Sequence, residues 1–294
     1  ALKQRWDALG HHIAYFLHNN TDIVVLTLFT NIMEVSVYAV YNMIVQALTN
    51  IIKVFSTGSE AAFGNMIAKN EKKSLVRNLK AFDLILSIII ITFFTVSGIL
   101  IIPFIKIYTY GVKDVNYIRP SFSVFIILAQ AIYCLRLPYQ HITLATGKYK
   151  ETRNGAFAEA AINIILSLIL VNFMGLTGVA IGTCLAMAYR IIQYAVFSCK
   201  NVLNIPISYF LKRSLVNISN VFIILFIASL IPQVENNTYF NWAINGIVLT
   251  LLAFSINIIT NLIFYRSEFK HIQLIIKNTV LNFKNKFLGG NKYV

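Results

Sequence analysis

Eight long apolar segments separated by short polar gaps dominate this chain of 294 residues. A helix needs about 20 mostly apolar residues to cross the roughly 30 Å hydrocarbon core of a membrane. Only 12% of the residues are charged and 57% are hydrophobic, whereas a soluble domain carries about 25% charged residues. We therefore predict an all-α, polytopic transmembrane helix bundle. The eight expected spans are residues 11–30, 36–67, 82–103, 119–145, 153–172, 176–198, 214–232 and 240–265.

Positively charged residues are concentrated in every second gap between these spans. Nineteen of the 25 Lys and Arg residues lie in residues 1–10, 68–81, 146–153, 199–213 and 266–294. The opposite gaps hold three, all within residues 104–119. Because cytoplasmic loops are enriched in Lys and Arg, we expect a multi-pass protein of the cytoplasmic (inner) membrane with both ends of this chain cytoplasmic. Cations at span ends meet anionic lipid head groups, so the net charge of +14 predicts membrane lipids as partners and no nucleic acid.

We take seven ionisable side chains inside the predicted spans as candidates for function, because charge there is costly and usually faces a bundle interior or a wet cavity. They are Asp22, Lys53, Glu60, Arg136, His141, Glu159 and Arg190. We expect a substrate-binding cavity lined by Arg136, Lys53, Arg190 and His141. Lys53 and Arg190 have a second explanation, in which long stems let their charges reach the membrane interface.

Arg136 is the most informative of these residues. It lies beside Pro138, the one proline expected inside a helix, whereas Pro103 is expected to end its span. An interior proline kinks a helix and frees a backbone carbonyl, which suits a cavity wall. A helical hairpin with its turn near Gly147 brings Arg136 close to the level of Glu159. Either the two form an internal ion pair, or Arg136 is available to an anion.

Asp22 ends a polar run, Asn19, Asn20 and Thr21, inside an otherwise apolar span. The run is either a hydrogen-bonded cluster that holds helices together or part of an ion-coupling pathway. Glu159 has the same two alternatives, and both stay open.

The tail, residues 266–294, has the pattern of a basic amphipathic helix. Its two faces carry Lys270, Lys277 and Lys284, and Ile272, Ile276, Val280, Phe283 and Phe287. Such a helix is suited to lie on an anionic leaflet.

No cofactor or metal is expected. Cys134, Cys184 and Cys199 lack metal-ligand spacing, and their odd number argues against a disulfide framework. The glycine-containing run 175–183 lacks the Gly-Lys-Ser/Thr of a nucleotide loop.

Four stretches, residues 18–26, 38–43, 145–152 and 175–183, have the order and spacing of one family. Together they resemble the polysaccharide-exporting flippases of the multidrug/oligosaccharidyl-lipid/polysaccharide (MOP) exporter superfamily. The resemblance implies two six-helix lobes followed by two extra helices. Eight spans then match the C-terminal lobe (residues 1–199) and an additional transmembrane hairpin (200–265), followed by the tail (266–294). We expect the N-terminal lobe to be missing from this chain.

By this resemblance, the substrate is a polyprenyl-pyrophosphate-linked oligosaccharide moved to the outer leaflet by alternating access for cell-surface polysaccharide synthesis. Other polysaccharide-assembly proteins are further expected partners. The alternative is an ion-coupled small-molecule or multidrug antiporter of the same superfamily, but cations at mid-membrane favour an anionic substrate. A membrane-bound polysaccharide polymerase would need large outer loops with clustered acids. The outer loops here are short, and we expect no enzymatic activity.

Overall fold

The computed structural model describes residues 16, 20–231 and 238–288, with side chains described as far as residue 277. All regular elements in these ranges are helical, which confirms the predicted all-α bundle. They are a short helix Asn20–Phe29, α2 (Ile32–Ser56), α3 (Ser59–Ala68), α4 (Lys72–Tyr108), α5 (Pro120–Ala145), α6 (Tyr149–Ser198), a π-helical turn η1 (Cys199–Leu203), α7 (Ser208–Leu230), α8 (Tyr239–Phe264) and α9 (Arg266–Leu288). Six of the described helical segments are long and apolar enough to cross a membrane. The chain is therefore a multi-pass membrane protein.

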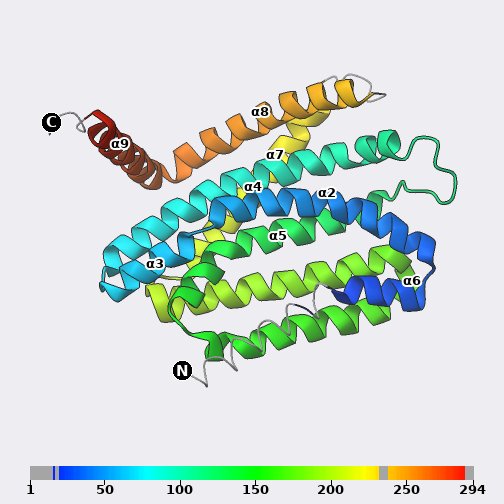
Figure 1. Cartoon of the computed structure of the whole chain (residues 1–294), viewed down its shortest axis with the longest axis horizontal. Helices are drawn as coiled ribbons and strands as arrows, with labels where there is room; N and C mark the ends of the chain where they lie inside the picture. The colour runs from blue at the N-terminus through cyan, green and yellow to red at the C-terminus, as the bar shows by residue number, and fades with distance from the viewer. Residues whose placement is uncertain (1–15, 17–19, 232–237, 289–294) are drawn as a thin grey trace.

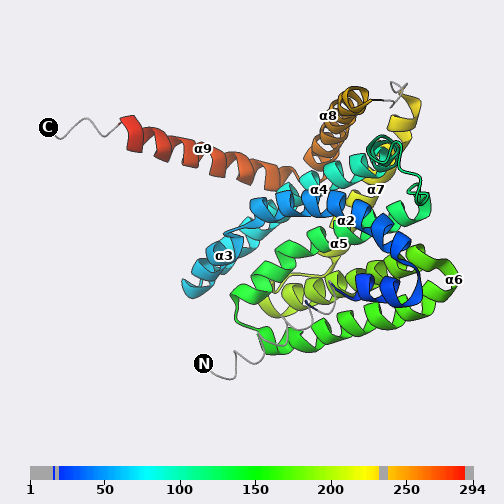
Figure 2. The same ribbon diagram turned by 45° about the vertical axis from the view of Figure 1, so that its right-hand side comes forward.

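Helix α6 consists of two antiparallel arms that fold back at Gly175 (Figures 1 and 2). Gly175 has φ 52° and ψ −131°, a backbone conformation that residues other than glycine rarely adopt. The arms pack backbone to backbone, since a Cβ on Gly178 would lie 2.3 Å from the carbonyl oxygen of Leu170. The two spans predicted at 153–172 and 176–198 are thus both present.

Several predicted boundaries differ from the structure: α4 begins at Lys72 and not at residue 82, and α7 begins at Ser208 and not at residue 214. The span expected at 36–67 is broken after α2, where Gly58 has φ 85° and opens the separate helix α3. Helix α4 does not end at Pro103 but continues to Tyr108. Its last turns are held by aromatic packing, because the Phe104 ring lies 5.1 Å from Trp242 and stacks on Tyr108 at 5.7 Å.

One large apolar cluster joins the short first helix, α2, α4, α5 and α6. Helices α7 and α8 cover one side of α4 (Figures 1 and 2). Many large apolar side chains on the outside are exposed, among them Phe173, Phe222 and Phe226. An apolar exterior of this kind suits contact with lipid. The polar groups described below are therefore exceptions inside an otherwise apolar bundle.

Candidate functional site

A buried ion triad connects α5 with both arms of α6. Arg136 Nη1 lies 2.6 Å from Glu159 Oε1, and Arg190 Nε lies 3.2 Å from Glu159 Oε2. Arg136 is 4% exposed and Arg190 is 2% exposed. The hairpin therefore produces the ion-pair alternative for Arg136. The expectation that Arg190 reaches the membrane interface is wrong, because the second arm of α6 turns its guanidinium inward.

Aromatic rings extend this triad to Lys53 on α2. The Tyr133 ring centroid lies 4.7 Å from the Arg136 guanidinium and 5.2 Å from Lys53 Nζ. Cations over an aromatic face are attracted by its quadrupole. Arg190 similarly lies 4.2 Å from the Tyr194 ring. We call Lys53, Arg136, Glu159 and Arg190 the basic cluster.

The basic cluster has three cations and one carboxylate, hence a net charge of +2 when all four groups are ionised. Its members differ in access: Lys53 is half-buried, whereas the other three are buried. Arg136 Nε has no hydrogen-bond partner among the described residues. Chemically, the cluster is a positive site at membrane depth, with Lys53 as its most accessible charge.

His141 does not belong to this cluster. Helical rise places it about 7.5 Å further along α5 than Arg136, and its Nδ1 lies 2.6 Å from Ser59 Oγ at the start of α3. The contact ties α5 to the break between α2 and α3. A cavity-lining role for His141 stays a prediction.

Asp22 forms a second buried polar site, between the short first helix and both arms of α6. Thr183 Oγ1 lies 2.9 Å from each Asp22 carboxylate oxygen, and Asn163 Nδ2 lies 3.4 Å from Oδ1. Further oxygens surround Thr183 Oγ1, with Asn163 Oδ1 and the Val179 carbonyl each at 3.2 Å. No ion pair within the described part of the chain includes Asp22. The Asp22 carboxylate accepts hydrogen bonds only from neutral groups among the described residues, and a small cation or a proton would neutralise its buried charge.

The polar run before Asp22 does not act as one unit. Asn20 is exposed, and its side chain donates to the Phe16 carbonyl at 2.7 Å. Asn19 lies outside the described residues. Two partners of Asp22 come instead from α6, more than a hundred residues away, and the Tyr38 hydroxyl of α2 donates to Asp22 Oδ2 at 3.4 Å.

A third buried charge site, formed by Asp83 on α4 and Arg213 on α7, was missed in the sequence. Arg213 Nε lies 3.2 Å from Asp83 Oδ2, and Tyr209 donates to the same oxygen at 2.9 Å. Arg213 also donates to Asn261 Oδ1 at 3.0 Å and stacks 3.7 Å from the Tyr265 ring. The assignment of Arg213 to a charged gap was wrong, because α7 begins at Ser208 and buries this side chain. One signal was available: Tyr209 and Arg213 are four residues apart, on one helical face.

A ladder of asparagines continues from this pair along α7 and α8. Asn220 donates to Asn257 at 2.8 Å, and Asn257 donates to Thr92 of α4 at 3.1 Å. Asn217 reaches Ser87 at 3.5 Å. Hydrogen bonds between membrane helices contribute about 0.6 kcal/mol each on average. The ladder and the Asp83–Arg213 pair together hold the α7–α8 hairpin against α4.

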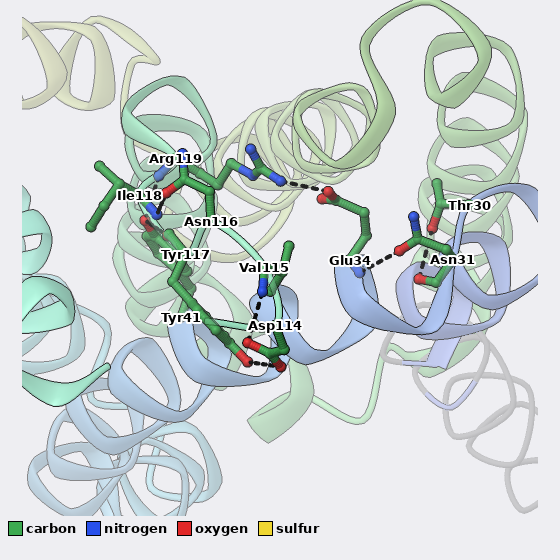
Figure 3. Close-up of polar contacts among 10 residues, drawn as sticks. All are labelled: Thr30, Asn31, Glu34, Tyr41, Asp114, Val115, Asn116, Tyr117, Ile118 and Arg119. Atoms are coloured by element: carbon green, nitrogen blue, oxygen red, sulfur yellow. Dashed lines mark hydrogen bonds and ion pairs between the residues drawn. The ribbon is translucent and has the colours of Figure 1, made fainter. Parts of the chain in front are cut away.

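At the end of the bundle where α2 begins, polar contacts join α2 to the loop before α5 (Figure 3). Arg119 Nη2 lies 2.6 Å from Glu34 Oε1. The Tyr41 hydroxyl donates to the Tyr117 carbonyl and accepts from the Arg119 backbone N–H, both at 3.0 Å. The ion pair is partly exposed, so it contributes little stability. Its effect is to position the loop over the start of α2.

Comparison with known proteins finds similarity of fold only, to two solved structures. No protein-family model matches the chain, and no curated protein sequence matches it either. Lipid II flippase MurJ in an inward closed conformation is similar in structure, with a TM-score of 0.65 and 21% identity over 87% of this chain and 52% of that chain. A MOP superfamily transporter from Pyrococcus furiosus is also similar, with a TM-score of 0.56 and 16% identity over 97% of this chain and 71% of that one.

These similarities define the class of fold. The chain has the helical architecture found in a lipid flippase and in a MOP superfamily transporter, and it spans about half the length of the flippase. This similarity of fold agrees with the architecture that the resemblance to the MOP exporter superfamily implies.

Proposed function

We propose that this chain is the C-terminal lobe (1–199) and additional hairpin (200–265) of a flippase for polyprenyl-pyrophosphate-linked oligosaccharides. The observation that carries the proposal is the basic cluster, with a net charge of +2 buried between α2, α5 and α6. An N-terminal lobe would complete the cavity, and alternating access would move the head group to the outer leaflet. The segments rich in Lys and Arg between and beyond the spans would then face the cytoplasm. These segments are residues 1–10, 68–81, 146–153, 199–213 and 266–294.

The physical basis is electrostatic attraction in a medium of low dielectric. Two unit charges 4 Å apart interact by about 4 kcal/mol at an effective dielectric constant near 20, and by about 1 kcal/mol in water. A pyrophosphate would therefore be attracted to the basic cluster more strongly than to a surface lysine. Lys53 is half-buried, whereas Arg136 and Arg190 are buried, so we assign the direct substrate contact to Lys53.

An apolar groove between this lobe and the additional hairpin is suited to the lipid part of such a substrate. It has a volume of about 660 Å³ and lies between α2, α4 and α8, with Leu48, Leu100 and Trp242 among its lining residues. A cationic drug would gain nothing from the basic cluster, so the antiporter alternative is the weaker proposal.

Replacement of Lys53 by glutamine in the complete protein should reduce transport while abundance stays normal. Loss of a charge-assisted hydrogen bond costs about 1.5–3 kcal/mol, which corresponds to roughly 10- to 100-fold weaker binding. Surface polysaccharide and membrane-protein abundance would be measured in cells whose own flippase gene is deleted. Lys53→Arg should retain function because it keeps the charge. Normal polysaccharide with Lys53→Gln would contradict the substrate contact.

We further infer that the Asp22 site takes the coupling cation or proton. Saturating a site of this kind at a hundred times its Kd stabilises the folded state by about 2.7 kcal/mol. The thermal unfolding midpoint of the purified protein should therefore rise with the coupling ion at constant ionic strength, or shift with pH for a proton. Asp22→Asn should abolish this response, and Asn20→Ala at the neighbouring exposed position should preserve it. A wild-type midpoint insensitive to monovalent cations and to pH would leave Asp22 as a structural cluster.

A further inference from the structure

Helix α9 begins where a membrane crossing ends. Helix α8 closes at Phe264, Tyr265 follows with a non-helical backbone, and α9 starts at Arg266. Both views show α9 turning away from α8 and projecting beyond the bundle (Figures 1 and 2). Because α8 has the length and composition of a span, the start of α9 lies at a membrane boundary.

The first turns of α9 are fixed against the bundle. Phe269 and Ile272 pack on a buried cluster that includes Leu84 of α4. His271 Nε2 lies 3.0 Å from Asn78 Oδ1, also on α4. Burial, together with the nearby Arg77 charge, lowers the pKa of His271, so this contact is made by a neutral ring at pH 7. These contacts set the rotation of α9 about its own axis.

Beyond these turns, the same apolar face is uncovered. Ile276 is four residues after Ile272, hence on the same face, and it is 57% exposed. Lys270 and Lys277 are seven residues apart, exposed, and form a stripe beside this face. The predicted continuation of both stripes, through Val280, Phe283, Lys284 and Phe287, lies outside the described side chains.

The charged side chains of α9 indicate which kind of surface covers its apolar face. The described side chains of α9 include three cations (Arg266, Lys270 and Lys277) and one carboxylate, Glu268. An amphipathic helix with lysines beside its apolar face binds by burying that face at the boundary between head groups and acyl chains, with the lysines near lipid phosphates. A bilayer is already adjacent, because α8 leads directly into α9.

We propose that α9 lies in the head-group layer of an anionic leaflet, with Ile276 toward the acyl chains and Lys270 and Lys277 against lipid phosphates. The helix would anchor the end of α8 and, through Phe269 and Ile272, the adjoining part of α4. This interaction does not depend on which substrate the protein carries.

A fluorescent label at Ile276→Cys tests the proposal in the full chain, with the buried cysteines Cys134, Cys184 and Cys199 replaced by alanine. The protein is reconstituted into phosphatidylcholine vesicles with or without phosphatidylglycerol. We expect phosphatidylglycerol to shift the label emission to the blue and to make it accessible to a lipid-borne quencher. A label at Ser267→Cys, on the opposite face of α9 and exposed, should remain water-like.

Charge variants separate lipid recognition from simple proximity. Lys270→Gln/Lys277→Gln should remove the phosphatidylglycerol-dependent quenching, while Lys69→Gln/Lys73→Gln should leave it intact because those lysines lie outside α9. High salt should weaken the effect through screening. A water-like label at Ile276 in both kinds of vesicle would overturn the proposal. Shielding from the lipid-borne quencher, or quenching indifferent to the α9 lysines, would overturn it equally.

Discussion

Asp83→Leu is expected to destabilise the protein by about 3–5 kcal/mol, because it leaves the Arg213 guanidinium buried without its carboxylate. Arg213 and Asp83 are each 2% exposed, so water cannot replace the lost partner. The change would also remove the acceptor of the Tyr209 hydroxyl. The expected result is a large fall in the thermal unfolding midpoint in detergent. Limited proteolysis should show earlier cleavage around the α7–α8 hairpin.

The double variant Asp83→Leu/Arg213→Met provides the matched control. Replacing both members of a buried ion pair by apolar residues is often close to neutral. We therefore expect it to recover most of the lost stability, with the remainder due to the unpaired Tyr209 and Asn261 groups. If the double variant were as unstable as Asp83→Leu, the charge pair would not be the cause.

Glu159→Gln should have an effect of similar size, since it removes the one carboxylate shared by Arg136 and Arg190. Both guanidinium groups are buried, and an uncompensated buried charge costs about 3–5 kcal/mol. The net charge of the basic cluster would rise from +2 to +3. We expect lower abundance in membranes and a reduced unfolding midpoint of the purified protein.

Restoring the charge balance should rescue this variant in part. Glu159→Gln/Arg136→Gln returns the net charge to +2, and it should be more stable than Glu159→Gln alone. An unfolding midpoint no higher than that of the single variant would contradict a charge-balance role. For the same reason, charge reversal at Arg136 reports on folding before it reports on substrate binding, which makes the half-buried Lys53 the better functional test.

The class of fold and the proximity of Arg136 to Glu159 were both predictable from the sequence. Length and apolarity of a span are local properties, because each helix satisfies its own backbone hydrogen bonds in lipid. The Arg136–Glu159 contact follows from a short turn, since a hairpin brings together residues at equal distances from it. The predicted boundaries at Pro103 and Gly58 were wrong because tertiary packing and backbone conformation determine where these helices end. Amino-acid composition carries no information on either.

The remaining polar contacts depend on which face each helix turns toward the bundle. Arg213 looked like a loop charge because its neighbours Lys212 and Lys200 are cationic, yet it pairs with Asp83, 130 residues earlier in the chain. Asp22 is likewise satisfied by Thr183, which is 161 residues away. Apolar spans have no strong amphipathic stripe to indicate their inward face, because lipid and protein interior are both apolar.

Sequence alone thus determined that the chain spans a membrane repeatedly, and it located the exceptional charges Asp22, Arg136, Glu159 and Arg190 but not Asp83 and Arg213, because burial of a charge in hydrocarbon is unfavourable whatever the fold. Only the tertiary structure determined which exceptions compensate one another. Glu159 is shared by two arginines, Asp83 pairs with Arg213, and Asp22 accepts hydrogen bonds from neutral groups. The physical reason is that ion pairs and hydrogen bonds act over a few ångströms, so they depend on helix rotation and packing that no local pattern specifies.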